Sequence, residues 1–248
     1  IHERLVGSEM CIRDSYLVGG CIRDILLGHK PKDFDIATSA TPEQIHKLFK
    51  RSRIIGRRFK LVHVMFSARK FIEVATFRAG KIQTSNDGLV HRDNYYGTLK
   101  DDVFRRDFTV NGLYYDINKS EVIDYVGGLK DLEILKINMI GNPSERFEED
   151  PVRMIRAVRF QAKLNATIDP KLNEDILKNS QLLANIPPAR LYEEVIKLFH
   201  NEKSIEVFHE LFNLGLLKHL FSQTQENSFV NASLINTSER IKNGSSVT

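Results

Sequence analysis

Two aspartates one residue apart, Asp33 and Asp35, constrain the fold and chemistry of this chain more than any other feature. On a strand, residues i and i+2 point to the same face, so the spacing predicts two neighbouring carboxylates. Such a pair repels itself unless a cation lies between the two groups. Mg²⁺ takes only one or two protein carboxylates and leaves room for substrate phosphates, and Mn²⁺ suits the same oxygens. The pattern favours a metal site, although an isolated Asp-x-Asp is more often solvated surface.

A glycine pair, Gly19-Gly20, precedes Asp33 by 13 residues and ends a short apolar stretch that we expect to be a strand. Glycine lets a phosphate approach the backbone, and Arg23 follows the turn. Taken alone, the glycines fit a plain tight turn equally well. Combined with the acidic pair, they indicate a site that transfers a nucleotide from a triphosphate.

Composition narrows the class of protein. The chain has 248 residues, is 42% hydrophobic and holds two cysteines, so we expect a reduced, cytoplasmic setting without a disulfide framework. No apolar run approaches the roughly 18 residues that a membrane span needs, so we expect no membrane association. The net charge of +4 and the pI of about 9.0 are compatible with a polyanionic partner.

The order of patterns predicts an α/β head over residues 16–140 and an all-α body over residues 141–221, joined at Gly141-Asn142-Pro143. Thr41 predicts a helix start, because Pro42 and Gln44 complete a capping box. Residues 1–15 and 222–248 are unassigned or frayed ends. Expected strands cover the segment of the two aspartates and residues 16–19, 53–66, 70–77, 121–126 and 134–140, whereas residues 145–220 read as helical throughout.

Two further segments carry charged side chains in suggestive patterns. Asp107 is a third acidic candidate, Arg105 and Arg106 are suited to triphosphate oxygens, and Asn111 shares a face with Asp107 if the segment is helical. A charged helix start explains that segment too. Farther on, arginines at i, i+3 and i+6 follow an acidic pair and could present guanidiniums to a base and to phosphates, or form a solvated basic face; these residues are Glu149, Asp150, Arg153, Arg156 and Arg159.

Three features stay open on sequence alone. Glu73 is a lone acid in an apolar strand, either beside the metal site or facing outward. His63 fits a packed strand histidine better than a catalytic base. A basic run contacts RNA or triphosphate, or is solvated surface: Lys47, Lys50, Arg51, Arg53, Arg57, Arg58 and Lys60.

Four motifs follow one another in order: Leu17-Val18-Gly19-Gly20-x-x-Arg23-Asp24-x-Leu26-Leu27-Gly28, Pro31-Lys32-Asp33-Phe34-Asp35, Arg105-Arg106-Asp107-Phe108-Thr109-x-Asn111 and Glu149-Asp150-Pro151-x-Arg153-x-x-Arg156-Ala157-x-Arg159-Phe160. Together they resemble the class II nucleotidyltransferases, which include tRNA CCA-adding enzymes and bacterial poly(A) polymerases. The resemblance spans about residues 16–220. It implies a polymerase-β-like nucleotidyltransferase head, a helical neck and body that binds RNA, and Mg²⁺-dependent transfer of AMP from ATP to an RNA 3′ end.

The resemblance also implies residue roles. Asp33 and Asp35 would bind the metals, and Asp107 would be the third active-site acid. The nucleotide would be contacted by Gly19, Gly20, Arg23, Arg105, Arg106, Asn111, Glu149, Asp150, Arg153, Arg156 and Arg159. In CCA-adding relatives, the segment of Glu149, Asp150 and Arg153 reads the incoming base.

Within the family, the paired arginines Arg57 and Arg58 resemble the poly(A) polymerase branch, which implies template-independent polyadenylation of RNA. CCA addition to tRNA is the alternative enzyme, and a catalytically inactive RNA-binding module is an alternative of another class. Residues 1–15 do not match the helical lead-in of the family. The chain ends where the family continues into further helical regions.

Overall fold

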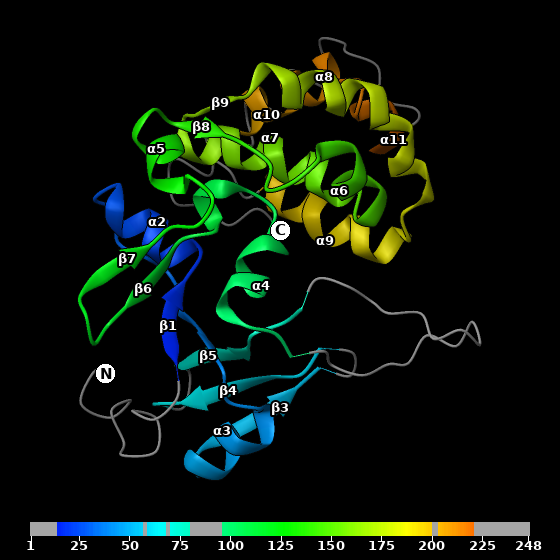
Figure 1. Cartoon of the computed structure of the whole chain (residues 1–248). Helices are drawn as coiled ribbons and strands as arrows, with labels where there is room; N and C mark the ends of the chain where they lie inside the picture. Colours follow the sequence, from blue (N-terminus) through cyan, green and yellow to red (C-terminus); the bar gives the residue numbers. More distant parts are fainter. Residues whose placement is uncertain (1–13, 57–58, 68–69, 80–95, 200–202, 221–248) are drawn as a thin grey trace, which may run out of the picture. The chain divides into compact units, whose positions relative to one another are not determined.

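The computed structural model describes residues 14–56, 59–67, 70–79, 96–199 and 203–220 (Figure 1). The chain divides into two compact units, residues 1–129 and residues 130–248. The expected boundary between residues 140 and 141 lies eleven residues later than this division, 140 − 129. No helix within the described ranges is long and apolar enough to cross a membrane.

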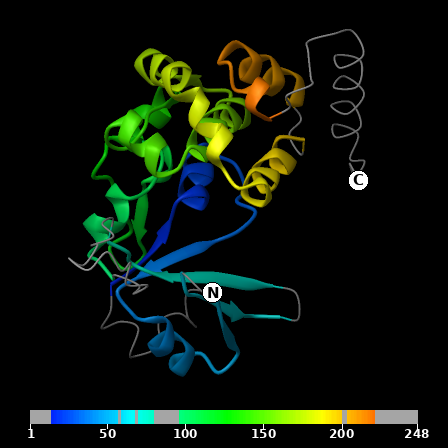
Figure 2. The same cartoon turned by 90° about the vertical axis from the view of Figure 1, so that its right-hand side faces the viewer.

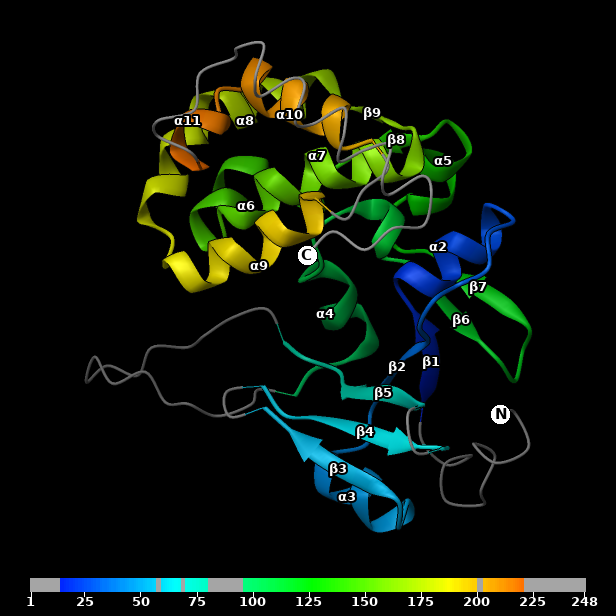
Figure 3. The same cartoon turned by 180° about the vertical axis from the view of Figure 1, so that it is seen from behind.

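A seven-stranded mixed sheet forms the first unit (Figure 3). Only β2 and β5 run parallel, and every other neighbouring pair is antiparallel. Parallel pairing needs a crossover connection, which here contains α3 (Pro42–Leu48). In spatial order the strands are β3 (Ser52–Ile55), β4 (Leu61–Met65), β5 (Phe71–Thr76), β2 (Asp35–Thr38), β1 (Ser15–Val18), β6 (Tyr114–Asp116) and β7 (Glu121–Ile123).

Alternation along the strands gives this sheet two different faces. The helix α3 covers one face of the sheet (Figure 2). Its Ile45 packs there with Ile36, Val62 and Val74. On the other face, Ala37 and Tyr114 pack with Val103 of α4 (Leu99–Phe104). The helix α3 starts at Thr41 with the complete predicted capping box. Asp35 of β2 and Glu73 of β5 point to the same face as α4, because each is next in the strand to a residue that packs against α3 on the opposite face.

Two strand predictions for this unit need correction. The expected strand 53–66 is two strands, β3 and β4, because the chain turns at Gly56. Gly56 has φ +92°, and a Cβ there would lie 2.2 Å from the carbonyl oxygen of Phe59, so only glycine fits. The strand β6 lies outside the expected strands, and its pairing with β1 is a tertiary contact that local propensity does not predict. The expected strand 121–126 ends at Ile123.

Helices dominate the second unit, and α7 (Val152–Leu164) packs against α6 (Pro143–Glu149), α9 (Pro188–Phe199) and α10 (Ser204–Asn213). The remaining helices are α5 (Gly128–Glu133), which begins in the first unit, α8 (Pro170–Asn179) and α11 (Leu217–Leu220); α2 (Gly20–Leu26) belongs to the first unit. The predicted strand 134–140 is reduced to β8 (Lys136–Ile137), which pairs in parallel with β9 (Thr167–Ile168). The stretch 145–220 is therefore not helical throughout.

Candidate active site

Strand pairing brings acidic residues together at the end of β1. Asp35 begins β2 and pairs with Val18, the last residue of β1, so the Gly19-Gly20 turn starts beside it. On its other side, Asp35 pairs in parallel register with Glu73 of β5. Paired residues in a sheet point to the same face, so Asp35 and Glu73 are neighbouring carboxylates. Of the two possibilities for Glu73, the structure favours the position beside the acidic pair.

Asp33 precedes β2 and lies outside any strand. The expectation that strand alternation alone aligns Asp33 with Asp35 is therefore wrong, because only Asp35 has strand geometry. Asp33 still acts on Asp35 electrostatically. Loss of water around its carboxylate raises the pKa of Asp35, the negative charges of Glu73 and Asp33 raise it further, and Arg106 opposes them. Negative charge is therefore crowded at this point.

This crowding bears on metal binding. Within the ranges that the structure describes, no group of three or more His, Cys, Asp or Glu side chains gathers closely enough to hold a metal by itself. A preformed cage is not what Mg²⁺ needs, since one or two carboxylates and substrate phosphates complete its ligands. Burial raises the pKa of Asp35 most, and the negative charges of Glu73 and Asp33 add to it, a repulsion that a divalent cation would relieve. The residues present therefore fit a substrate-completed Mg²⁺ or Mn²⁺ site.

His63 forms the outer neighbour of Glu73. The two residues pair in antiparallel register, and His63 Nε2 lies 3.5 Å from Glu73 Oε2. The His63 ring also stacks on Phe71, with ring centroids 4.0 Å apart. These contacts agree with the prediction of a packed strand histidine.

Arginines surround a single buried carboxylate on α4. Asp102 is fully buried, and its Oδ1 accepts hydrogen bonds from Arg105 Nε at 2.7 Å and from the Arg78 N–H at 3.0 Å. Its Oδ2 accepts from Arg106 Nη2 at 3.1 Å and from the Tyr114 hydroxyl. Burial and the positive charge of Arg105 lower the pKa of Arg78 to about 10, which shows how closely the cations gather. We call Arg78, Arg105, Arg106 and Asp102 the arginine cluster.

Arg106 connects the arginine cluster to the glycine turn. Its Nη1 lies 3.3 Å from the point where a Cβ on Gly19 would sit, and Gly19 has φ +74°. Glycine is required there both for the backbone conformation and for the approach of the guanidinium. The charge of Arg106 also opposes the rise in the pKa of Asp35 that burial and Glu73 cause. A positive group thus lies beside the turn and acts electrostatically on Asp35.

The segment from Arg105 to Asn111 is not a regular helix. The helix α4 ends at Phe104, and only residues 109–111 form a short 3-10 helix. The expected contact between positions i and i+4 exists nevertheless, because Asn111 Nδ2 donates to Asp107 Oδ1 at 3.2 Å. Asp107 also accepts from the Phe108 N–H at 2.8 Å. The structure thus holds Asp107 by local hydrogen bonds, whereas the carboxylates that act on Asp35 are Glu73 and Asp33.

Arg23 is only 2% exposed. Its Nη1 donates to Asn111 Oδ1 at 2.6 Å, and its Nε donates to Asp24 Oδ1 at 2.8 Å. Arg23 and Asn111 therefore join the glycine-turn helix α2 to the segment of Asp107. The predicted nucleotide contacts of both residues remain predictions.

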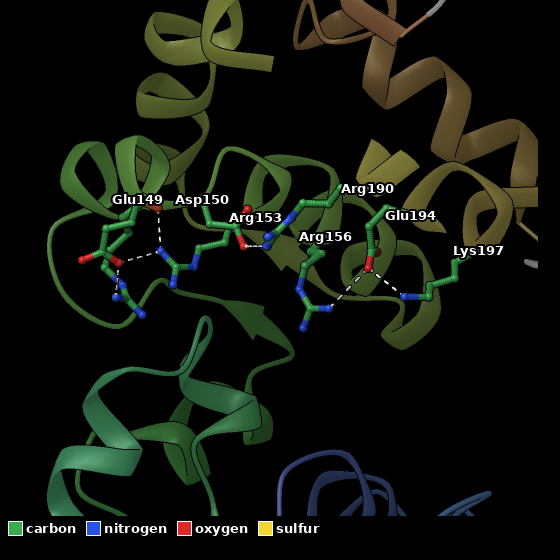
Figure 4. A network of polar contacts seen from close by, with 8 residues as sticks. Glu149, Asp150, Arg153, Arg156, Arg190, Glu194 and Lys197 are labelled. Atoms are coloured by element: carbon green, nitrogen blue, oxygen red, sulfur yellow. Dashed lines mark hydrogen bonds and ion pairs between the residues drawn. The ribbon is translucent and has the colours of Figure 1, made fainter. Parts of the chain in front are cut away.

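In the second unit, the acidic and basic residues around α7 form ion pairs with one another (Figure 4). Arg153 Nη1 lies 2.9 Å from Glu149 Oε2 and donates to the Arg146 carbonyl oxygen at 2.6 Å. Asp150 accepts from Arg190 of α9. Arg153 is thus paired with an acid four residues before it, whereas the partner of Asp150 lies 40 residues later in the sequence.

Glu194 of α9 is the second buried carboxylate that collects cations. Arg159 Nε lies 3.4 Å and Arg156 Nη1 lies 3.7 Å from its oxygens, and Lys197 Nζ donates to it at 2.8 Å. The arginines predicted to face a nucleotide therefore share a carboxylate that lies more than thirty residues later in the chain.

Sequence reasoning missed Asp102, Tyr114, Arg190 and Glu194. Asp102 had a local signal, because Arg105 and Arg106 follow it at i+3 and i+4 on the end of a helix. Tyr114 and Arg190 meet their partners only through tertiary packing, and so does Glu194 apart from Lys197 three residues after it. The paired arginines Arg57 and Arg58 lie outside the described residues.

Two family models match the chain. The model described as the poly A polymerase head domain matches residues 15–138. The model described as the probable RNA and SrmB-binding site of polymerase A matches residues 165–227.

Curated relatives agree with these models. Poly(A) polymerase I of Haemophilus influenzae is 48% identical over 217 residues, which cover 84% of this chain and 48% of the relative. Poly(A) polymerase I of Escherichia coli is 50% identical over 84% of this chain and 46% of its own length. A CCA-adding enzyme of Bacillus pumilus is 38% identical over 78% of this chain and 48% of its length. The chain spans about half the length of the curated relatives it matches.

Solved structures share the fold. The Bacillus stearothermophilus CCA-adding enzyme in complex with CTP has a TM-score of 0.78 at 30% identity, covering 95% of this chain and 55% of its own. A tRNA nucleotidyltransferase complexed with a primer tRNA and an incoming ATP analog has a TM-score of 0.75 at 26% identity, over 92% of this chain and 65% of its own. The expected α/β head with the polymerase-β-like fold and the helical region after it are confirmed.

Proposed function

This chain belongs to the class II nucleotidyltransferases, the family of poly(A) polymerases and CCA-adding enzymes, and we propose that it polyadenylates RNA 3′ ends without a template. The observation that supports this proposal most is that Asp35 and Glu73 are paired beside the arginine cluster and the Gly19 turn. Acids for a metal and cations for phosphates thus occur together. Identities of 48–50% to poly(A) polymerases, against 34–38% to CCA-adding enzymes, favour ATP addition.

The reaction joins the RNA 3′ oxygen to the α-phosphorus of ATP and breaks the bond from that phosphorus to the bridging oxygen. Pyrophosphate leaves, and the hydroxyl proton passes to water. A divalent cation held at this site would supply Lewis acidity for the transfer. In our proposal, Asp33 and Asp35 hold this cation, while Glu73 and Asp107 are further acids of the site.

Arg106 and Arg105 are proposed to bind the triphosphate. A guanidinium offers paired donors that match phosphate oxygens, and its positive charge attracts the triphosphate of ATP. Gly19 and Gly20 allow the phosphates to approach the backbone. Arg23 and Asn111 hold the turn and the Asp107 segment in register through their hydrogen bond. Positioning and charge thus supply the catalysis without a covalent intermediate.

In the second unit, the nucleotide-binding role of Glu149, Asp150, Arg153, Arg156 and Arg159 is part of the same proposal. Aspartate and arginine edges can present a base with the donors and acceptors of a pairing partner. The ion pairs of Arg153 with Glu149 and of Asp150 with Arg190 hold those edges in fixed orientations. Selection of ATP without a template needs such fixed edges, because no nucleic-acid strand supplies them.

An extension assay tests the function. An RNA oligonucleotide and a tRNA lacking its 3′ end are incubated with Mg²⁺ and with ATP or CTP separately. We expect a long ladder from ATP on the oligonucleotide and little use of CTP. Short additions confined to the tRNA, first from CTP and then from ATP, would establish CCA addition instead. RNA binding without pyrophosphate release from any nucleotide would establish the inactive RNA-binding module.

Two acid variants test the site. We expect Asp35→Asn and Glu73→Gln each to lower ATP turnover at least about 100-fold, because each removes charge that the transition state uses. RNA affinity should stay within a few-fold. Glu174→Gln is the control, since Glu174 forms a solvent-exposed pair with Lys178 on α8. A Glu73→Gln variant with wild-type turnover would remove Glu73 from the site.

A further inference from the structure

Donors from several parts of the chain fill the acceptor sites of the buried Asp102 carboxylate. Both of its oxygens accept two donors, which come from the Arg78 backbone, from Arg105 and Arg106, and from Tyr114. The donors belong to different parts of the first unit: α4 and its end, the segment after β5, and β6. Such a carboxylate fixes the positions of its partners relative to one another.

The guanidinium of Arg106 is the most constrained of these partners. Its Nε donates to the Tyr114 hydroxyl at 2.7 Å, and its Nη2 donates to Asp102. Its Cζ lies 5.0 Å above the Tyr114 ring, so the ring also supports one face of the guanidinium. Tyr114 is completely buried, which holds this support in place. One edge of Arg106 is thus held by Asp102 and Tyr114, while Nη1 points toward Gly19.

We propose that Asp102 and Tyr114 are positioning residues that aim Arg106 at the triphosphate of ATP. This inference rests on the proposed function, in which Arg106 binds phosphate. An arginine that is held in place loses little side-chain freedom when phosphate binds, whereas an unheld arginine must lose it at that moment.

A purely structural role makes a different prediction. If Asp102 and Tyr114 serve only the fold, their removal lowers stability and leaves the affinity for ATP unchanged in the protein that remains folded. If they position Arg106, removal weakens ATP binding more than it lowers kcat, because the chemistry of Asp35 is untouched.

Tyr114→Phe is the principal test. It keeps the ring beneath Arg106 and removes only the hydroxyl that connects Arg106 to Asp102. Tyr115→Phe is the matched control, because Tyr115 is the next residue of β6 and points to the other face of the sheet. ATP binding is measured by calorimetry with Mg²⁺ and without RNA, so that no turnover occurs. Extension assays on the same proteins give KM and kcat.

We expect Tyr114→Phe to raise the Kd and KM for ATP about tenfold, the effect of losing one charge-assisted hydrogen bond. The kcat should fall less than about threefold, and Tyr115→Phe should match the wild type in both values. Asp102→Asn should raise the Kd for ATP at least as much wherever it folds.

Unchanged ATP affinity in a folded Tyr114→Phe protein would overturn the positioning role while leaving the proposed function standing. Failure of the wild-type chain to bind ATP would overturn both. A fall in kcat alone, with wild-type Kd and KM, would also overturn the inference, because it would place Tyr114 in the chemical step rather than behind Arg106.

Discussion

In the first unit, Asp102 holds Arg105 and Arg106 from three and four residues away, whereas in the second unit Glu194 of α9 holds Arg156 and Arg159 of α7. The first set is short, with nitrogen–oxygen distances of 2.5 and 3.1 Å. The second set is longer, at 3.7 and 3.4 Å. Local spacing on one segment produces tight geometry, while pairs between two helices depend on how closely those helices pack.

Among the changes considered for Asp102 and Glu194, we expect removal of the charge of Asp102 to lower the free energy of unfolding most. We expect Asp102→Asn to lower the free energy of unfolding by about 2–3 kcal/mol, because it leaves guanidiniums near a buried neutral group. This is the lower end for a broken buried pair, since both arginine side chains keep about a fifth of their surface in water. Urea denaturation measures the loss.

Asp101→Asn is the control for that variant. Asp101 is the exposed neighbour of Asp102 and closes the capping box at the start of α4. Its replacement should cost at most about 1 kcal/mol, the usual value of a cap. Equal losses for the two variants would contradict the central position of Asp102.

The stability difference between the wild type and Asp102→Asn should also depend on pH. Burial alone would raise the pKa of Asp102, but Arg106 and Arg105, with the Tyr114 hydrogen bond, hold it below its usual value. A carboxyl with a lowered pKa in the folded state stabilises the protein above its unfolded pKa of about 3.9 and loses this contribution as pH falls through the folded pKa. The gap in stability between the wild type and Asp102→Asn should therefore narrow below about pH 4. A constant gap from pH 7 to pH 3 would contradict the lowered pKa.

Neutralising Glu194 should lower the free energy of unfolding less than neutralising Asp102 does. Glu194→Gln should lower the free energy of unfolding by about 1 kcal/mol, because its arginine partners lie farther away and water screens them in part. Glu193→Gln, the exposed neighbour on α9, should change it by less than about 0.5 kcal/mol. Urea denaturation of both variants tests this. If Glu194→Gln lowered the free energy of unfolding as much as Asp102→Asn, the two carboxylates would not differ in their contribution to stability.

The smallest effect belongs to Lys197, which donates to Glu194 at 2.8 Å but is 49% exposed. Lys197→Met should change the free energy of unfolding by less than about 0.5 kcal/mol, since exposed ion pairs contribute little. Thermal unfolding at low and at 1 M salt should give the same difference from the wild type. If the free energy of unfolding fell by more than about 1 kcal/mol at low salt and by less at 1 M salt, the ion pair of Lys197 with Glu194 would contribute more to stability than we expect.

Sequence reasoning located most of the candidate site because its parts are short and local. The glycine turn, the acidic pair, the Arg105-Arg106-Asp107 segment and the helix start at Thr41 each depend on neighbours within a few residues. The i, i+4 spacing of Asp107 and Asn111 predicts a shared face only for a helical segment; their hydrogen bond forms although only residues 109–111 are a short 3-10 helix. The strand that should carry both aspartates carries only Asp35, since strand boundaries depend on pairing as well as propensity.

By itself, the sequence determined which local turns, caps and charged segments exist, and in which order they follow, because these depend on backbone preferences and short-range hydrogen bonds. Only the tertiary structure decided which segments meet. Glu73 joins Asp35 through parallel register across 38 residues, 73 − 35, and Glu194 meets α7 through helix packing. The physical reason is that register and packing are settled by burial of the whole sheet and the whole helical unit, which no short stretch of residues contains.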